Sequence, residues 1–324
     1  MEGGKRLEFA IWGAGAVGLG LANALARPGE RVGVIARDRV TRAALERDGI
    51  RRLGIFGEHD VPPEQLAVLS DASGLCAAPP AWLLICTKAF ATAAIARELE
   101  GLTSLRESRT RLLLCQNGWG NESPFRAFWP ESRLFHARVI TGFTRRAPHE
   151  VEITAHASPI ALGSVFGAGI GSLEAVARRL GEGGLPAETT QDMRGVLWGK
   201  MLYNCALNPL GALAGRSYGE LTHDPTTRVL VDEVIREIFR VLDAASIPIA
   251  WPNADAYLET FHRDLIPPTA AHESSMLQDL RAGRPTEIEA LCGAVERLGR
   301  RHGIETPVVS ALATLVRKAE AAER

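Results

Sequence analysis

Three polar residues spaced four apart stand out in the segment 198–210, which reads WGKMLYNCALNPL. On a helix, Lys200, Asn204 and Asn208 would lie along one face, because residues four apart are neighbours on a helical surface. Their neighbours are largely apolar, so a buried cation and two buried amides would need polar partners. Because Asn208 precedes Pro209, we expect a break or kink there. By itself, the pattern fits a solvated stripe as well as a binding site.

A glycine-rich turn near the N-terminus predicts a nucleotide site. An apolar run is followed by G-A-G-A-V-G and then by a helical pattern, which is the context that a dinucleotide-binding fingerprint requires. In this motif Gly13 permits the tight turn, Gly15 lets the backbone approach a pyrophosphate, and Gly18 lets helix and strand pack closely. The N-terminus of the helix then holds the phosphates. We therefore expect the cofactor to contact Gly13, Ala14, Gly15, Ala16, Val17 and Gly18.

The next predicted strand, 31–36, ends at residues that bear on the choice between NAD and NADP. An acidic residue at this place holds the ribose 2′-hydroxyl of NAD, whereas an arginine suits the 2′-phosphate of NADP. Arg37 comes first, with Arg39 and Arg42 close behind, so the sequence favours NADP. Asp38 would suit NAD, and ordinary surface arginines that open a helix would give the same pattern.

Two further apolar runs, 82–88 and 111–118, are typical of buried strands in a parallel sheet. Ligands bind beyond the carboxyl ends of the strands in such sheets. Lys88 and Asn117 stand at those ends. We therefore expect both side chains at the cleft that the glycine-rich turn defines.

The later part of the first half predicts further strands within 134–164, a helix at 172–182 and a short strand at 186–190. From residue 191 onward the pattern is helical. The expected fold class is α/β. An N-terminal Rossmann-type domain with a mostly parallel sheet would span residues 1–190, and an all-helical domain would span residues 191–324.

Two acidic or hydroxyl-bearing segments of the second half could also carry chemistry. Ser275 lies on a predicted helix that Gly283 would end. Thr286 is expected to cap the next helix, with Glu289 completing a capping box and Glu287 in the first turn. Acidic residues favour helix N-termini for dipole reasons alone, so Glu287 has a structural explanation beside a functional one.

Composition excludes several classes of function. The net charge of −1 over 324 residues gives no electrostatic reason to expect nucleic acid or an anionic membrane as a partner. No apolar run approaches the roughly 18 residues of a membrane span, and the N-terminal segment lacks the features of a signal peptide. The five cysteines lack C-x-x-C spacing and the histidines show no ligand spacing, so we expect no metal. Together these features predict a cytoplasmic protein.

Taken together, the motifs resemble those of the ketopantoate reductase (2-dehydropantoate 2-reductase) family. The resemblance covers nearly the whole chain. It rests on the glycine-rich turn, Lys88, Gln116-Asn117-Gly118, the K-x-x-x-N-x-x-x-N-P segment at 200–209, and the block SSMLQDLRAGRPTEIEALCG at 274–293. It implies NADPH-dependent reduction of a small 2-keto acid, in first place ketopantoate to pantoate.

The resemblance also implies roles for single residues at the substrate. Lys200 would be the general acid that protonates the keto oxygen as hydride arrives. This role makes chemical sense, because hydride addition leaves an alkoxide that a nearby cation or proton donor stabilises. Asn204, Asn208 and Ser275 would hold the hydroxyl and the carboxylate of the substrate.

Other residues would contact the cofactor. By the resemblance, Lys88 and Asn117 would line the nicotinamide end of the cleft, where Asn117 would also meet the substrate. Thr144 would make a further cofactor contact. Glu287, counted as catalytic with Lys200, would reach the cofactor ribose from the helical domain.

One departure from the family pattern concerns substrate choice. The family often has a substrate-contacting asparagine where this chain has Tyr218, in SYGEL. An opine, imino-acid or hydroxy-acid dehydrogenase on the same two-domain plan is therefore an alternative. A non-catalytic regulator that senses NADP is a more remote one, since a sensor has no need for the proton donor Lys200. The sequence leaves a homodimer open.

Overall fold

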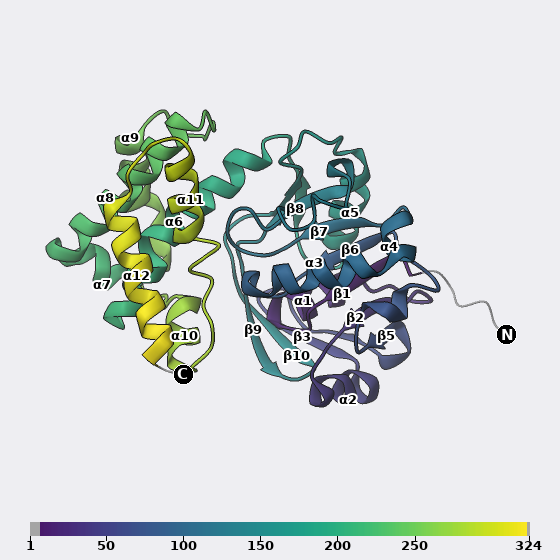
Figure 1. Ribbon diagram of the computed structural model, residues 1–324. Coiled ribbons are helices and arrows are strands. Elements are labelled where there is room, and N and C mark those ends of the chain that lie inside the picture. The colour runs from purple at the N-terminus through teal and green to yellow at the C-terminus, as the bar shows by residue number, and fades with distance from the viewer. Residues whose placement is uncertain (1–6, 323–324) are drawn as a thin grey trace. The chain divides into compact units, whose positions relative to one another are not determined.

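The computed structural model describes residues 7–322. They divide into two compact units, the first formed by 7–116 and 121–193 and the second by 117–120 and 194–322 (Figure 1). From the sequence we expected one boundary, after residue 190. The division instead falls after Met193 and also assigns the short loop Asn117–Gly120 to the second unit. No helix within the described range is both long and apolar enough to cross a bilayer.

The first unit is built on an eight-stranded sheet with the order β12-β11-β8-β7-β6-β1-β2-β5. Strands β1, β2, β5, β6, β7 and β8 are parallel, whereas β11 runs antiparallel to β8 and pairs in parallel with β12. This arrangement confirms the predicted mostly parallel sheet. The strand bounds are β1 (Phe9–Trp12), β2 (Val32–Ile35), β5 (Leu66–Leu69), β6 (Trp82–Ile85), β7 (Arg111–Leu114), β8 (Leu134–Arg138), β11 (Ile160–Gly163) and β12 (Ala187–Thr189).

Helices cover both faces of this sheet. Because side chains alternate along a strand, Phe9 and Ile11 of β1 face one core cluster and Ala10 and Trp12 face another. Residues of α1 and α5 complete the first cluster, and residues of α3 and α4 complete the second. The helices of this unit are α1 (Ala16–Leu25), α2 (Arg39–Asp48), α3 (Thr92–Gly101), α4 (Thr103–Glu107) and α5 (Gly171–Glu182).

A second, four-stranded sheet of the first unit has the order β4-β3-β10-β9. It packs on α1, where Gly20 allows close approach, because a Cβ there would lie 2.3 Å from the ring of Phe143. The sequence predicted strands within 134–164, where two of these four strands lie, but not their separation from the main sheet. Their bounds are β3 (Ile50–Gly54), β4 (His59–Val61), β9 (Thr141–Ala147) and β10 (Glu150–His156).

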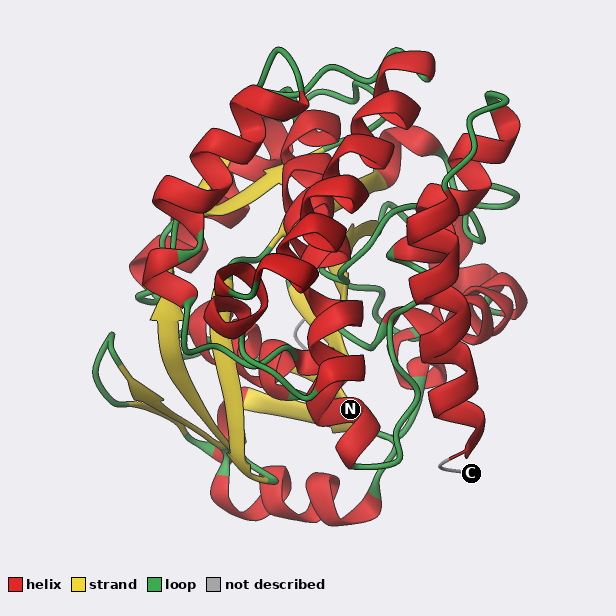
Figure 2. Ribbon diagram, turned by 90° about the vertical axis from the view of Figure 1, so that its left-hand side faces the viewer, coloured by secondary structure: helices red, strands yellow, loops and turns green. Residues whose placement is uncertain are grey.

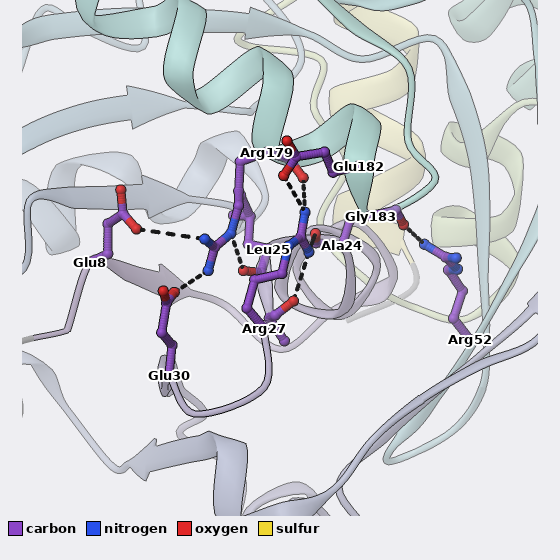
Figure 3. Close-up of polar contacts among 10 residues, drawn as sticks. Glu8, Ala24, Leu25, Arg27, Glu30, Arg52, Arg179, Glu182 and Gly183 are labelled. Atoms are coloured by element: carbon purple, nitrogen blue, oxygen red, sulfur yellow. Dashed lines mark hydrogen bonds and ion pairs between the residues drawn. The ribbon is translucent and has the colours of Figure 1, made fainter.

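Two arginines fasten α5 to the end of α1 (Figure 3). Arg27 donates to the carbonyls of Ala24 and Arg179, and Arg179 donates to the carbonyl of Leu25 at 3.0 Å. Arg179 also forms an ion pair with Glu30. Helix termini leave carbonyl groups without intrahelical partners, and these side chains bind them. The helix that begins at the glycine-rich turn is thus held firmly at its other end.

The second unit contains only helices and irregular segments within its described residues (Figure 2). Its core surrounds α6, from which Trp198, Leu202 and Cys205 are fully buried. Asp224 is the N-cap of α8, since its side chain accepts from the N–H of Thr226. The helices are α6 (Met193–Ala214), α7 (Tyr218–His223), α8 (Pro225–Ala244), α9 (Ala254–Thr260), α10 (Ser275–Arg281), α11 (Cys292–Arg301) and α12 (Pro307–Ala322).

Two local predictions in this unit need correction. First, the expected break at Asn208 does not occur, because α6 continues through Pro209, whereas a kink there stays a prediction. Proline removes one helical hydrogen bond, but Leu207 and Leu210 are buried on either side, and this packing holds the helix together. Gly283, by contrast, follows the end of α10 with a φ of 60°, as expected of a helix stop.

Second, no helix begins at Thr286, because α11 starts only at Cys292. The carboxylate of Glu289 does not complete a capping box but binds Arg317 and Arg297. The carbonyl of Ala290 accepts from the N–H of Trp119, from the loop that joins this unit. Tertiary contacts thus hold 286–291 as an irregular turn.

Candidate active site

Lys200, Asn117 and Glu287 form a continuous hydrogen-bonded chain within the second unit. Lys200 Nζ donates to Asn117 Oδ1 at 2.6 Å, and Asn117 Nδ2 donates to Glu287 Oε2 at 3.1 Å. The amide of Asn117 thus has its acceptor turned to the cation and its donor turned to the carboxylate, which fixes its orientation. Glu287 is buried, with 7% of its surface exposed, and Lys200 is half-buried. Hydrogen bonds to charged groups are the stronger ones in proteins, so these three side chains hold each other in place.

The loop that carries Asn117 is docked on the turn that carries Glu287. The N–H of Trp119 donates to the carbonyl of Ala290 at 2.9 Å. The indole of Trp119 packs against that of Trp198 on α6, with 5.2 Å between ring centroids. Gly118 has a φ of 98°, and a Cβ there would lie 2.5 Å from the Ala290 carbonyl oxygen. Only glycine fits this close approach without strain.

The sequence grouped Asn117 with the strand that precedes it, whereas the structure groups it with Lys200. These two residues are 83 positions apart in the chain. Nothing in the local sequence around either residue signals this pairing. The sequence also placed Glu287 in the first turn of a helix, whereas an irregular turn positions its carboxylate in the structure.

The polar face of α6 carries the other two predicted residues. Asn204 is half-buried, and its side chain makes no hydrogen bond to any described residue. Asn208 is buried, and its Oδ1 accepts from the hydroxyl of Tyr218 at 2.7 Å. The hydroxyl of Ser274 donates to the backbone carbonyl of Asn208 at 3.4 Å. Ser275, the next residue, is exposed at the start of α10. Because Ser274 contacts the carbonyl of Asn208, the backbone of Ser275 also lies close to Asn208.

The glycine-rich turn of the first unit has the geometry of a phosphate cradle. Gly13 has a φ of 111°, and a Cβ on Gly18 would lie 1.8 Å from the carbonyl oxygen of Gly13. Both positions therefore require glycine. A Cβ on Gly15 would meet no heavy atom of the described residues within 4 Å. Gly15 is the N-cap of α1 and offers no side-chain cap, so the first N–H groups of α1 are open to an anion.

The turn after β2 uses its acidic residue to cap a helix. Asp38 accepts from the backbone N–H and the hydroxyl of Thr41 at the start of α2, and these hydrogen bonds hold the pKa of its carboxyl below its usual range. Arg42 donates to the backbone carbonyls of Ala36 and Arg37 and so closes the turn. The side chain of Arg37 is 58% exposed, and its guanidinium pairs with Glu98 at 2.8 Å. Glu98 was missed in the sequence, where it lies 61 residues away.

Lys88 and Thr144, the remaining predicted cofactor residues, also lie in the first unit. Lys88 follows β6, is half-buried, and precedes the 3-10 turn Ala89–Ala91. Its neighbour Thr87 fills the space where a Cβ on Gly13 would go, which places Lys88 next to the glycine-rich turn. Thr144 lies on β9, paired with Glu152 of β10.

No group of three or more His, Cys, Asp and Glu side chains within residues 7–322 is arranged to hold a metal ion. All five cysteines are free thiols. The expectation that the protein needs no metal stays a prediction.

Comparison with known proteins shows the family of this chain. The model of "Ketopantoate reductase PanE/ApbA" matches residues 9–166, and that of its C-terminal domain matches residues 192–320. A 2-dehydropantoate 2-reductase from Aquifex aeolicus is 33% identical over 97% of each chain. The chain belongs to the ketopantoate reductase family. It is therefore an oxidoreductase of the class that acts on CH–OH groups.

Solved structures agree with this assignment. A PanE/ApbA family ketopantoate reductase from Ralstonia eutropha has a TM-score of 0.81 and 27% identity, and the match covers 97% of this chain and 99% of that one. A 2-dehydropantoate 2-reductase from Geobacter metallireducens has a TM-score of 0.84 and 27% identity over 96% and 100% of the two chains. A D-mandelate dehydrogenase with NADH and anilino(oxo)acetate, 23% identical, shares the fold with a TM-score of 0.83 over 97% of this chain and 98% of that one.

Proposed function

We propose that this enzyme reduces ketopantoate to pantoate with NADPH, and that Lys200 is the general acid. The observation that carries the proposal is the hydrogen-bonded chain from Lys200 through Asn117 to Glu287. It presents a cation at a fixed position on a helix that also bears two amides. Family membership supports the same substrate class.

The proton chemistry follows from the charge that the reaction creates. Bound NADPH would supply the hydride to the keto carbon. The keto oxygen then gains negative charge, and the ammonium group of Lys200 stabilises that charge and gives up a proton to it. Asn117 keeps the ammonium in place, because its Oδ1 already accepts from Lys200 Nζ at 2.6 Å. Glu287 acts on Lys200 through Asn117 by fixing the amide orientation.

The first unit supports a dinucleotide cofactor. The open space at Gly15 and the uncapped N-terminus of α1 fit a pyrophosphate, whose charge the helix dipole favours. Ala14, Ala16 and Val17 would line the same turn, Lys88 follows the adjacent strand, and Thr144 would contribute from β9. These residues fit the cofactor that the family implies.

The choice of NADPH over NADH rests on the turn after β2. Both carboxylate oxygens of Asp38 accept hydrogen bonds from N–H groups in the first turn of α2. The carboxylate is therefore not directed at a ribose hydroxyl. Arg37 is largely exposed, and a guanidinium binds a phosphate in the geometry that it uses for carboxylates such as that of Glu98. The 2′-phosphate of NADPH would take the place of the Glu98 carboxylate.

Substrate binding would use the rest of the polar face. The amide of Asn204 makes no hydrogen bond to any described residue, and the Nδ2 group of Asn208 makes none either. Together with Ser275 at the start of α10, these groups suit the hydroxyl and carboxylate of a small 2-keto acid.

A different 2-keto acid is the second candidate substrate. Two observations favour it: Tyr218 stands against Asn208, and the D-mandelate dehydrogenase fold matches nearly the whole chain. An opine or imino-acid substrate would use the same hydride and proton transfers.

A spectrophotometric panel separates these candidates. Oxidation of NADPH and of NADH is followed at equal concentrations with ketopantoate, benzoylformate, 3-methyl-2-oxobutanoate and pyruvate, the last also with an added amine. We expect the highest kcat/KM for ketopantoate with NADPH. A higher value for another compound would contradict the proposed substrate, and no oxidation with any of them would contradict the proposed function. Asn117→Ala serves as a matched variant, in which we expect kcat to fall because the ammonium group of Lys200 loses the acceptor that holds it in place.

A further inference from the structure

The hydroxyl of Tyr218 has one hydrogen-bond partner among the described residues, the side chain of Asn208. Tyr218 is 4% exposed, and burial raises the pKa of its phenol well above the usual range. The group is therefore an O–H donor at any physiological pH. A buried hydroxyl proton needs an acceptor, and Asn208 Oδ1 at 2.7 Å is the acceptor that the structure provides.

Tyr218 is held from several sides. The ring packs edge-on against Tyr203, with 5.6 Å between centroids, and tilted against His272 at 5.1 Å. The backbone N–H of Tyr218 donates to the carbonyl of His272, and the N–H of Gly219 donates to the carbonyl of Ala270 at 2.8 Å. A Cβ on Gly219 would lie 3.0 Å from that carbonyl oxygen, so the first turn of α7 sits tightly on this segment. The hydroxyl is thus a donor at a fixed point.

A fixed donor determines which end of the Asn208 amide is free. An amide has one acceptor end and one donor end. Because Tyr218 binds Oδ1, the end that remains is Nδ2, which makes no hydrogen bond to any described residue. The reversed orientation of the amide would leave the buried phenol proton without an acceptor. That orientation should therefore be populated roughly tenfold less, or lower still, than the observed one.

We propose that Tyr218 is a positioning residue that orients the Asn208 amide, so that Asn208 offers only N–H donors to an oxygen of the substrate. The inference rests on the proposed 2-keto acid reduction. Asn208 lies eight residues beyond Lys200 on α6, a rise of about 12 Å, and the lysine side chain leans toward the helix N-terminus. The oxygen that Asn208 binds therefore belongs to the end of the substrate remote from the reacting carbon. The substrate class is a 2-keto acid with an oxygen acceptor on its far end.

Two substrates test this assignment. Ketopantoate carries a terminal hydroxyl oxygen, and 3-methyl-2-oxobutanoate lacks the hydroxymethyl group that bears it. We expect Tyr218→Phe, which keeps the ring packing, to lower kcat/KM for ketopantoate roughly three- to tenfold through KM. For 3-methyl-2-oxobutanoate the change stays within about twofold. In an Asn208→Ala background, Tyr218→Phe has no further effect on either substrate.

Each other outcome has a definite meaning. Equal losses on both substrates, or a full additional loss in the Asn208→Ala background, would show that the hydroxyl acts only on the fold or at another group, which overturns the inference. A wild-type enzyme that reduces both substrates equally well would also overturn it while leaving the proposed reduction intact. A wild-type enzyme that reduces neither would overturn the proposed function itself. Thermal unfolding of each variant checks that the fold is retained.

Discussion

The ammonium group of Lys200 lies 2.6 Å from the amide oxygen of Asn117, although the two residues are separated by 83 positions in the chain. Asn117 lies in a loop directly after Gln116, the last residue of its segment in the first unit. That loop nevertheless belongs to the helical unit, where Trp119 and Gly118 dock it on the turn before α11. The proposed proton donor is thus oriented by a residue that enters its unit from another part of the sequence.

Replacing Lys200 should separate chemistry from cofactor binding. Lys200→Ala removes the cation that would stabilise the developing alkoxide, so we expect kcat to fall roughly 10²–10⁴-fold. The dissociation constant of NADPH, measured by fluorescence titration, should stay within about threefold, since Lys200 is not among the residues proposed to bind the nucleotide. Lys200→Arg keeps the charge and serves as the control. A kcat close to wild type in Lys200→Ala would remove this residue from the mechanism.

Because Arg37 and Glu98 form an ion pair, substitutions of the two residues should change the affinity for NADPH in opposite directions. Arg37→Ala should weaken NADPH binding roughly 10- to 100-fold, because a charge-assisted contact to the phosphate is lost. NADH binding should change little. Glu98→Gln removes a carboxylate that competes for Arg37, so NADPH should bind about two- to fivefold tighter. Isothermal titration of both nucleotides with both variants measures these affinities, and equal losses of NADPH and NADH in Arg37→Ala would contradict the cofactor assignment.

Two glycines of the nucleotide turn form a matched pair. A Cβ on Gly18 would lie 1.8 Å from the carbonyl of Gly13, so Gly18→Ala should lower the free energy of unfolding by about 3 kcal/mol. Gly15→Ala meets open space and should change it by less than about 1 kcal/mol. The added methyl group would instead block the approach of the pyrophosphate and weaken NADPH binding roughly tenfold or more. Urea unfolding and nucleotide titration of both variants make the comparison, and unimpaired NADPH binding by Gly15→Ala would speak against this turn as the phosphate site.

A buried carboxylate in the first unit predicts a pH effect on stability. Glu122 Oε2 lies 3.3 Å from His136 Nε2. Burial by itself raises the pKa of Glu122, but the hydrogen bond and charge of His136, together with a backbone hydrogen bond and the charge of Arg126, outweigh it, and the net pKa is lowered. A carboxyl with a lower pKa in the folded state contributes stability above its unfolded pKa of about 4.3, and this contribution is lost as the pH falls through the folded pKa. Urea unfolding between pH 7 and pH 3 should therefore show a shallower acid loss in Glu122→Gln than in the wild type. A steeper loss in the variant would contradict this sign.

Patterns within one segment were predictable, and arrangements across segments were not. The roles of Gly13 and Gly18 in the turn follow from strand, turn and helix context, and the structure shows the strained φ and the close approach that those roles require. The stripe of Lys200, Asn204 and Asn208 follows from helical spacing. The role of Asp38 as the N-cap of α2 could also have been predicted, since aspartate before a helix is a common N-cap.

The remaining features depend on contacts between distant residues. Glu287 fits a helix start by its neighbours, but Ala290 and Glu289 are engaged by Trp119 and Arg317 instead. Glu98 reaches Arg37 from another helix, and Tyr218 reaches Asn208 from α7. Propensity and spacing describe only the near neighbours of a residue, whereas tertiary packing decides between the local options that they leave.

The loop Asn117–Gly120 limits how the protein can be engineered in parts. A helical fragment cloned from residue 194 onward would contain Lys200 and Glu287 but would lack the amide that joins them. A chimera that takes residues 1–193 from a relative, for example to change the cofactor, would import the donor's version of this loop and set it against the recipient's Ala290 and Trp198. Exchanges of the nucleotide-binding half should therefore leave residues 117–120 with the half that contains Lys200.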